Sequence, residues 1–400
     1  MKKILALLLT LVMALSLTAC GGQEETSDTP ADEGGETSQG ETADIKVGLI
    51  CVHDQNSGYD VAHIDGLTAA CEALGIDPTD TNQVVFKYNV AENQACYDAA
   101  VDLAEQGCDI IFSDSYGHQP YMLQAAREYE DITFVSCTGD QAGVSGLDNF
   151  KNIFPYTYES RYVSGVVAGL KLNEQIEKGE FTADEAVMGY VGAYPYAEVI
   201  SGYTAFYLGA RSVCPSVTMK VQYTNSWADM AMEQEAASAL ISQGCKLISQ
   251  HADTTGAPTA CQAQGVPCVG YNVSMISVAP DSALTSAAVV WAPYYNYAVN
   301  CLINGEEIAT DWCKGFSEGA TEIKELNEKV VAAGTAEKVA EVEAALKDGT
   351  LHVFDCSTFT VDGKTLTDAD SQYIWDGYFH ESELASAPSF DFIIDGISIN

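Results

Sequence analysis

The sequence predicts an α/β protein made of two similar lobes, each with its own parallel sheet. The first observation is an internal repeat, in which residues 89–93 lead through an alanine-rich helical segment to residues 106–113. About 137 residues later, residues 225–229 lead through a similar segment to residues 243–250. The second observation is the regular alternation of apolar, strand-length runs with helical segments. Two copies of one strand–helix–strand unit predict two related lobes.

Each copy of the repeat ends in a small polar loop, at residues 114–117 in the first copy and 251–256 in the second. Each copy also contains a matching first strand, at residues 84–89 and 220–225. Open parallel sheets bind ligands beyond the carboxyl ends of their strands, which is where both loops fall. We therefore expect a ligand cleft between the two lobes.

The first lobe is expected to alternate strands with helices from residue 45 onward. Residues 45–52 form an almost continuous apolar run, as in a strand that is covered on both faces. A polar loop and a helix over residues 59–74, ended by Gly75, follow it, and Asn93 is expected to cap the next helix. Further strands are expected at residues 109–113, 133–137 and 149–154.

The second lobe restarts with a strand at residues 187–192, again followed by a polar loop and a helix. Glu159 and Arg161, at a helix start near the first crossover, are expected to form a structural pair. The tail from residue 321 is expected to hold two helices and two short strands, and to cross back between the lobes. The remaining strands are expected near residues 220–223, 247–250, 267–270 and 284–290, and those of the tail near 352–354 and 359–361.

The N-terminus predicts export. Two lysines precede an apolar run at residues 4–17, which is too short for a comfortable bilayer span and is typical of a secretion signal. The run ends in Leu-Thr-Ala-Cys at residues 17–20, which resembles the lipobox of bacterial lipoproteins. Residues 1–19 are thus predicted as a signal peptide and Cys20 as the lipidated residue; an ordinary signal with a chance cysteine is the alternative. Residues 20–44 are predicted as a disordered acidic tether.

The charge balance restricts the ligand. The chain has 18 Lys and Arg against 57 Asp and Glu, a formal net charge of −39. Nucleic acids require cationic side chains to neutralise their phosphates, so we expect no nucleic-acid partner. A neutral or cationic small molecule is more compatible than a polyanionic one, although the acidity by itself is also explained by solubility.

The thirteen cysteines contain no Cys-x-x-Cys pair, and several fall inside expected strands or helices. Most are therefore expected to be small buried apolar residues, with at most one or two disulfides. The six histidines are scattered, without a His-x-x-x-His or Cys/His spacing, so the sequence predicts no metal site. No cofactor is expected.

Several ordered motifs resemble the basic membrane protein family, the substrate-binding lipoproteins of ABC importers. The motifs are Glu-Ser-Arg-Tyr-Val-Ser-Gly at residues 159–165, Ala-Gly at 168–169, Gly-Tyr-Val-Gly at 189–192, Asn-Ser-Trp-Ala-Asp at 225–229 and Leu-Thr-Ser at 284–286. The resemblance runs from about residue 45 to the C-terminus. It implies the type I periplasmic-binding-protein fold: two doubly wound parallel-sheet lobes, at residues 45–157 and 158–290, with residues 291–400 providing hinge crossovers and completing the lobes.

Two further segments resemble a subgroup of this family associated with purine bases or nucleosides: Gln-His-Ala-Asp-Thr-Thr-Gly at residues 250–256 and Trp-Ala-Pro-Tyr-Tyr at 291–295. The family's Gly-Val-Asp segment appears here as Gly-Tyr-Asn at 270–272, and the lysine of nucleoside receptors after Leu-Thr-Ser is absent. An Asp can accept two hydrogen bonds from ribose hydroxyls, whereas Asn offers one acceptor and one donor group. These departures bear on recognition of the ribose more than of the base.

Seven residues are candidate ligand contacts. Tyr116 is expected to stack on a flat ring, an interaction of roughly 1–3 kcal/mol per base; packing beneath its own loop is the alternative. The other candidates are the aromatic residues Tyr59, Trp227 and Trp291, the base-reading side chains of Asp253 and Asn272, and Gly117, whose backbone could approach a ligand. Either Trp could instead fill the hinge, and His251 is expected to orient its loop.

The sequence as a whole predicts a monomeric, lipid-anchored solute-binding protein on the extracytoplasmic face of the cell membrane. Its lobes are expected to close on a small neutral ligand, a purine base or nucleoside, and to pass it to an ABC permease. It is not expected to be an enzyme, because it has no Gly-x-Ser-x-Gly motif, no Walker loop and no Asp-rich motif after the first strand. A ligand sensor for signalling and, less favoured, a nucleoside-processing enzyme are the alternatives.

Overall fold

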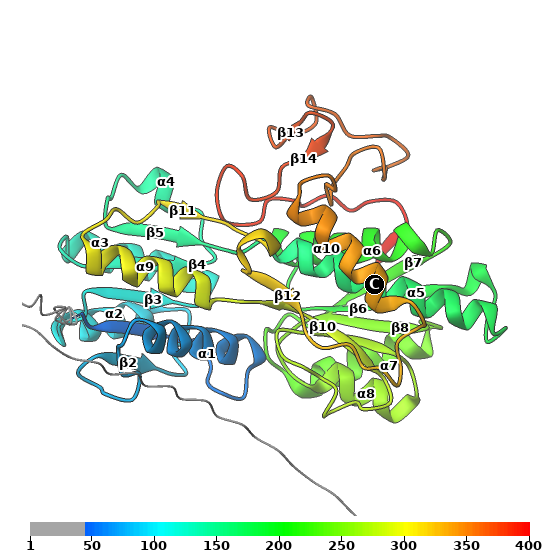
Figure 1. Ribbon diagram of the computed structural model, residues 1–400, viewed down its shortest axis with the longest axis horizontal. Coiled ribbons are helices and arrows are strands. Elements are labelled where there is room, and N and C mark those ends of the chain that lie inside the picture. The colour runs from blue at the N-terminus through cyan, green and yellow to red at the C-terminus, as the bar shows by residue number, and fades with distance from the viewer. Residues whose placement is uncertain (1–44) are drawn as a thin grey trace, which may run out of the picture. The chain divides into compact units, whose positions relative to one another are not determined.

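The computed structural model describes residues 45–400, so the predicted signal peptide, Cys20 and tether lie outside the described residues. These residues belong to one compact unit, called the folded unit below. It contains two large sheets, each flanked by helices, and a short two-stranded sheet (Figure 1). None of the helices in this described part is long and apolar enough to cross a bilayer.

The first lobe is built on a six-stranded parallel sheet in the order β11-β5-β4-β3-β1-β2. Helices α1 and α9 pack on one face of this sheet, and α2 and α3 pack on the other. The elements are β1 (Val47–Ile50), α1 (Gly58–Ala73), β2 (Val84–Lys87), α2 (Gln94–Glu105), β3 (Ile110–Ser113), α3 (Gln119–Glu128), β4 (Thr133–Cys137), α4 (Ala142–Ser145), β5 (Phe150–Ile153), α9 (Ala292–Asn304) and β11 (Asp311–Trp312).

The second lobe is built on a seven-stranded sheet in the order β12-β10-β9-β8-β6-β7-β15, parallel except for the antiparallel β12. Helices α5 and α6 pack on one face, with α10 against α5, and α7 and α8 pack on the other face. The elements are α5 (Thr157–Glu177), β6 (Val187–Gly192), α6 (Ala197–Val213), β7 (Thr218–Tyr223), α7 (Met230–Ser242), β8 (Leu247–His251), α8 (Gly256–Gln264), β9 (Cys268–Tyr271), β10 (Ala283–Val289), β12 (Thr321–Ile323), α10 (Thr335–Lys347) and β15 (Ile397–Ile399).

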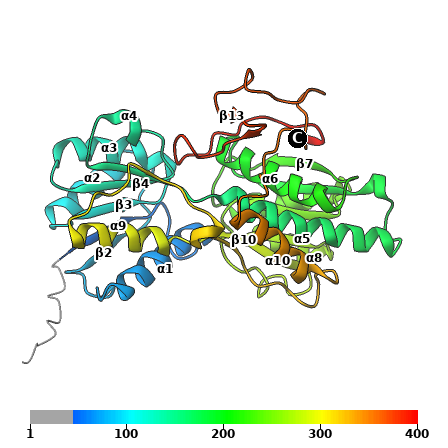
Figure 2. The same cartoon turned by 45° about the horizontal axis from the view of Figure 1, so that its top comes forward.

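Three crossovers join the lobes. The chain passes from β5 to α5, returns from β10 to α9, and crosses again from β11 to β12 (Figures 1 and 2). The chain after β10 therefore completes both sheets, as β11 joins the first and β12 and β15 join the second. The last crossover precedes residue 321, so the strands that the tail adds to the sheets do not cross back between the lobes as expected.

The starts and ends of the helices follow from local chemistry. Ser57 caps α1, because its hydroxyl accepts the N–H of Asp60 at 3.3 Å. Gly75, which ends this helix as predicted, has a φ of +77°, a left-handed conformation that glycine adopts without steric cost. Asn93 caps α2 as predicted, since its side-chain oxygen accepts the N–H of Ala95 at 2.9 Å.

Every strand predicted for the two lobes is present, but the prediction for the tail is partly wrong. Only one helix, α10, follows residue 321 in the described chain, and residues 352–354 and 359–361 form loops rather than strands. The short strands of the tail are instead β13 (Ile374–Trp375) and β14 (Tyr378–Phe379). The apolar residues that suggested strands are buried side chains of the second core, where Phe354 stacks on Phe390 with ring centroids 4.5 Å apart.

Two further expectations concern side chains. The twelve described cysteines are all free, and eleven are buried, as expected of small apolar residues. The predicted pairing of Glu159 with Arg161 is wrong, because the two point to different partners. Glu159 accepts the N–H of Phe316 at 2.7 Å, whereas Arg161 donates to the carbonyl of Gln250 at 2.7 Å.

Candidate ligand-binding site

Each sheet has a topological switch point at the first strand of its lobe in chain order. In the first sheet, β1 lies between β2 and β3, and in the second sheet β6 lies between β7 and β8. The connections on the two sides of such a strand lie on opposite faces of the sheet, which leaves a crevice beyond the carboxyl ends of the strands. The loops after β1 and β3 and those after β6 and β8 therefore carry the candidate site.

A small cleft lies between these loops. Its first-lobe wall is formed by Val52, Tyr59, Ser115 and Tyr116, and its second-lobe wall by Glu198, Trp227, His251, Asp253 and Tyr271. The cavity between them measures about 20 Å³, which is room for roughly one water molecule. A backbone contact also crosses the cleft, since the N–H of Gly58 donates to the carbonyl of Asp253 at 3.0 Å. The described arrangement of the lobes is therefore closed.

Tyr59 is held in place by the first lobe. It lies in the first turn of α1, and its hydroxyl donates to the carbonyl of Asp114 at 2.7 Å. The edge of its ring meets the indole of Trp291 with a centroid distance of 6.0 Å. Tyr116 follows β3 and is 41% exposed, so its ring is free to meet a ligand.

The second-lobe wall is organised around the buried Arg161. Its guanidinium lies 3.7 Å from the ring centroid of Tyr271, a cation–π contact within the wall. The imidazole Nε2 of His251 lies 3.3 Å from a carboxyl oxygen of Glu198, in the first turn of α6. Trp227 is placed by the loop between β7 and α7, and the N–H of Asp253 donates to its carbonyl at 2.8 Å.

Burial shifts the protonation of the groups in this wall. It raises the pKa of Glu198 to about 7, although the charge of Arg161 opposes the rise. It also raises the pKa of Asp253 well above the usual range, and the neighbouring carboxyl groups of Asp60 and Glu233 add to the effect. Burial and the charge of Arg161 lower the pKa of His251, so that its imidazole is neutral. A protonated carboxyl group donates one hydrogen bond and still accepts others, so this wall can match both donors and acceptors of a ligand.

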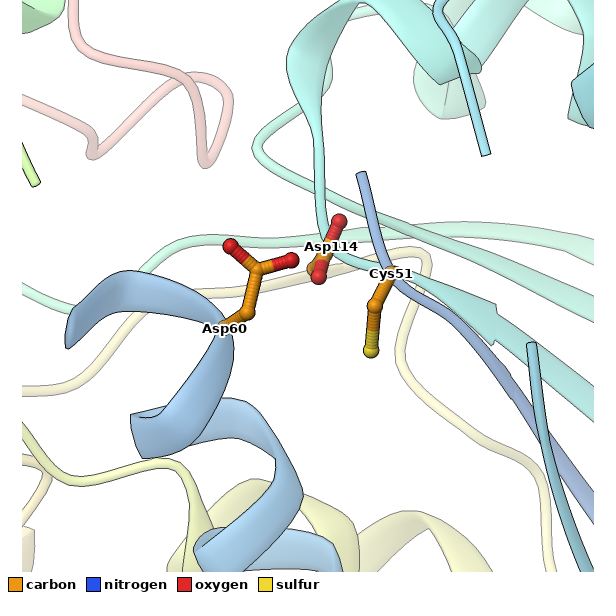
Figure 3. A group of neighbouring side chains, drawn as sticks. All are labelled: Cys51, Asp60 and Asp114. Carbon is orange, nitrogen blue, oxygen red and sulfur yellow. The ribbon is translucent and has the colours of Figure 1, made fainter. Parts of the chain in front are cut away.

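The side chains of Cys51, Asp60 and Asp114 form a buried cluster in the first lobe, where the end of β1, the start of α1 and the end of β3 meet (Figure 3). One potential ligand atom of each residue lies within 4.8 Å of the others, close enough to share a metal ion, although the sequence spacing predicts no metal site. Backbone groups already bind both carboxyls: the N–H of Val52 donates to Asp114 at 3.0 Å and that of His53 to Asp60 at 2.8 Å. These contacts hold the loops after β1 and β3 in place.

The two carboxyl groups of this cluster differ in protonation. Burial and the charge of Asp60 raise the pKa of Asp114 well above its usual value. Burial acts on Asp60 in the same direction, but hydrogen bonds from His53 and Ser57 outweigh it and lower the pKa. A proton taken up by the pair therefore binds to Asp114 in preference to Asp60. Because Val52, Tyr59 and Ser115 are the chain neighbours of the cluster, it positions half of the cleft.

The structure brings four of the seven predicted contact residues together around the cleft: Tyr59, Tyr116, Trp227 and Asp253. Trp291 lies outside the lining, because the crossover into α9 turns its ring into the core of the first lobe, where it stacks on His63 at 3.7 Å. Asn272 is 1% exposed and does not line the cleft. The N–H of Gly117 is used within the lobe, since it donates to Glu92 at 3.1 Å.

Sequence reasoning missed Glu198 and Tyr271, and it gave His251 only a role in orienting its loop. The sequence did contain a signal for Glu198, because this residue follows the loop after β6, which occupies the same place in its lobe as the loop after β1. Acidic residues in a first helical turn are common, however, because they complement the helix dipole, and this made Glu198 inconspicuous.

Comparison with known proteins agrees with this architecture. The family model described as "ABC transporter substrate-binding protein PnrA-like" (Bmp) matches residues 55–350. A purine-binding protein of Brucella abortus (strain 2308) is 32% identical over 312 residues, which cover 78% of this chain and 83% of that protein. A Haloferax volcanii protein that is named as an ABC transporter glucose-binding protein is 29% identical, over 84% of this chain and 80% of its own length.

A solved structure shares the fold. An ABC transporter solute-binding protein from Aeropyrum pernix K1 superposes with a TM-score of 0.62 at 17% identity, over 78% of this chain and 93% of that chain. The fold predicted from the resemblance, two doubly wound lobes joined by a multi-crossover hinge, is thus confirmed, and so is the family. The chain belongs to the Bmp family, and it is an extracytoplasmic, membrane-associated substrate-binding protein of an ABC transporter, whose partners are a small-molecule ligand and a permease.

Proposed function

We propose that this protein captures a purine, as a free base or a nucleoside, between its two lobes. The observation that carries the proposal is the supply of aromatic faces from both sides of one cleft, Tyr59 and Tyr116 from the first lobe and Trp227 from the second. Flat heterocycles gain most from such faces, because a base that stacks on an aromatic side chain is stabilised by roughly 1–3 kcal/mol. The purine-binding relative at 32% identity supports the same ligand class.

The polar groups of the cleft suit the edges of a purine. Asp253 and Glu198 offer carboxyl oxygens to an exocyclic amine or a ring N–H, and the protonated form of either can donate to a ring nitrogen. None of the described residues that line the cleft is Lys or Arg, and the imidazole of His251 is neutral because burial lowers its pKa. The cleft should therefore favour an unphosphorylated ligand over a nucleotide.

A hexose is the second candidate, because carboxyl groups beside aromatic rings also suit a sugar and one relative is named as a glucose-binding protein. The purine has the stronger support, since its relative is more similar and Tyr59 and Trp227 belong to opposite lobes that can enclose a thin ring. Neither ligand requires catalysis, so the proposed role is capture and release without chemistry.

We also infer that the mature protein is a monomer, anchored by lipid at Cys20 and tethered by residues 20–44. Delivery to a permease rather than signalling is the favoured use of the captured ligand. Replacement of Cys20 by Ala should abolish labelling of the protein by palmitate and release it from membranes of the expressing cell. Labelling that persists in this variant would contradict the anchor.

A thermal-shift screen of the folded unit tests the ligand. Free purines, nucleosides, hexoses and amino acids should be compared, because a ligand that binds only the native state raises the melting temperature with its concentration. We expect purines to give the largest shift. Stabilisation by hexoses or amino acids alone would leave the family assignment intact and reject the purine.

Matched variants test whether the ligand that raises the melting temperature binds in the cleft. Trp227→Ala should lower the affinity for the stabilising purine by about tenfold or more, as expected from the loss of roughly 1.4 kcal/mol of stacking. Tyr88→Ala is the control, since Tyr88 is an exposed aromatic residue next to β2, outside the cleft. Equal affinities in both variants would remove Trp227 from the binding site.

A further inference from the structure

The C-terminal segment makes a further connection between the lobes, besides the three crossovers. The family model ends at residue 350, so this connection comes from a part of the chain outside the matched region. In Figures 1 and 2 the red segment extends from the second lobe toward the first. We call residues 382–389 the strap. They contain no helix or strand, so their position depends on side-chain packing and on individual hydrogen bonds.

The base of the strap belongs to the second lobe. After the strap, the chain pairs β15 with β7 of the second sheet. Phe379 and Phe390, on either side of the strap, are buried in the core of this lobe with their ring centroids 5.0 Å apart. Glu381 is 2% exposed, and one of its carboxyl oxygens accepts the N–H groups of Ser389 at 2.9 Å and Phe390 at 2.8 Å. The two ends of the strap are thus held together, as in a compact Ω-loop.

The tip of the strap lies in the first lobe. Ser386 is fully buried, although it is a polar residue in an irregular segment. Its N–H donates to a carboxyl oxygen of Asp311, in β11, at 2.9 Å, and its hydroxyl donates to the carbonyl of Gly139, after β4, at 3.3 Å. Both acceptors belong to the first lobe, so these two hydrogen bonds connect one lobe to the other. A hydrogen bond to a carboxylate is about twice as strong as one between neutral groups.

The loop after β4 offers the tip a rigid acceptor. A Cβ at Gly139 would overlap with the side chains of Gln119 and Asn152, so this position has no room for a side chain. Gln119 also fixes the loop, because its carbonyl oxygen accepts the N–H of Asp140 at 2.7 Å. Thr138 has a φ of +68°, a left-handed value that β-branched residues rarely adopt. Such strain persists where the surroundings over-determine it, and it is concentrated at functional sites.

The strap lies beside the ligand cleft. Residues 385 and 387–389 line a cavity of about 400 Å³, whose other walls include Tyr116 of the first lobe and Glu198 of the second. Both of these residues also line the cleft. Because the base and the tip of the strap belong to different lobes, separation of the lobes next to this cavity would pull the two apart.

We propose that residues 382–389 fasten the two lobes in the closed arrangement, with Ser386 as the tip that is released when the lobes open. Opening must then break the two hydrogen bonds of Ser386 as well as the contact of Gly58 with Asp253. The released groups can bind water instead, so the fastening is reversible. The strap therefore favours closed molecules even before a ligand arrives. This inference goes beyond the proposed function and does not depend on which ligand is bound.

Amide hydrogen exchange, resolved to single residues in the ligand-free folded unit, tests the strap. The N–H of Gly58 is protected by a bond that crosses the cleft, so its exchange rate reports how often the lobes separate. The Asp311→Ala/Ser386→Ala protein lacks the carboxyl acceptor and the hydroxyl donor of the tip. In it we expect Gly58 to exchange about tenfold faster or more, from the loss of a hydrogen bond to a carboxylate. The amides of β3 and β8, inside their sheets, should keep their rates, because each lobe stays folded.

The matched control is Asp148→Ala/Ser357→Ala. Asp148 is exposed in the first lobe and Ser357 is exposed on the C-terminal segment, and both lie outside the strap. Exposed substitutions change stability little, so the Gly58 rate should stay within about twofold of the unaltered protein.

A milder variant guards against misfolding of the double variant. Asp311→Asn keeps an acceptor but removes the charge, and should raise the Gly58 rate by a smaller factor of about threefold. A Gly58 rate within about twofold of the unaltered protein in the folded strap variants would overturn the inference. A rise that the amides of β3 and β8 share would also overturn it, because the lobes would then be unfolding rather than separating. Either outcome would leave the proposed function standing.

Discussion

Glu198 changes its charge near neutral pH in the second-lobe wall of the cleft, because burial raises its pKa to about 7 from an ordinary value of 4.5. A carboxyl group with a raised pKa contributes stability below its unfolded pKa, and that contribution is lost as the pH rises through the folded value. Above pH 7 the folded protein therefore holds a desolvated carboxylate at Glu198, which the charge of Arg161 only partly offsets.

Replacement of Glu198 by Gln should show how much free energy the buried carboxylate costs the folded state. We expect Glu198→Gln to raise the free energy of unfolding at pH 8 by on the order of 1–3 kcal/mol, since the buried charge is removed. At pH 5 the gain should nearly vanish, because the native carboxyl is then already protonated. Thermal unfolding at both pH values measures the difference.

The control for this substitution is Glu337→Gln. Glu337 also lies in the first turn of a helix, α10, but its side chain is exposed. Its replacement should change the melting temperature little at either pH. A gain for Glu198→Gln of the same size at pH 5 and pH 8 would show that the benefit has a cause other than charge.

Single-residue roles were the least predictable from the sequence. Trp227 and Trp291 both follow strands and resemble each other as cleft candidates, but only Trp227 lines the cleft. The crossover after β10 turns Trp291 onto His63 instead, and this direction depends on how the lobes are connected in space. Neither composition nor spacing carries that information.

At the scale of elements, the closest helix pair in the second lobe is α5 with α6. Gly165 of α5 faces the backbone of Phe206, and Gly209 of α6 faces the backbone of Tyr162. A Cβ at either position would overlap with a carbonyl oxygen of the opposite helix. The helices can approach this closely only because both positions lack a side chain.

Gly165→Ala should therefore destabilise the protein, although alanine favours an isolated helix. We expect a loss of about 3 kcal/mol, since the overlap is with backbone and forces the helices apart. Chemical denaturation measures the loss, and Ser212→Ala, on an exposed part of α6, is the control with little expected effect. A Gly165→Ala protein as stable as the control would mean that the two helices can separate without cost.

Which strands could be predicted from the sequence depended on the internal repeat. The strands β2 and β3 and their counterparts β7 and β8 could be predicted, because each belongs to a strand–helix–strand unit whose pattern occurs twice, and β3 and β8 are buried throughout. Residues 352–361 could not, since their apolar side chains are buried by contacts with distant residues such as Phe390 rather than by a sheet. The residue types in this segment are those preferred in strands only because their side chains are buried.

At the scale of the described chain, the two switch points face one another across a cavity of about 20 Å³. No purine fits such a volume, so a ligand can enter only if the lobes separate. Three crossovers and the C-terminal segment connect the lobes, and the contact of Gly58 with Asp253 must break on opening. Hinge motion of two rigid lobes is the simplest movement that keeps both sheets intact.

Small-angle scattering of the folded unit tests this movement. Without ligand, we expect a radius of gyration larger than that calculated for residues 45–400 in the closed arrangement, because a population of open molecules must exist for ligand to enter. A saturating purine should reduce the radius toward the closed value, and the Trp227→Ala protein should require more purine for the same change. Ligand-free protein that scatters like the closed arrangement, with no change on addition of a purine that stabilises it, would contradict the hinge.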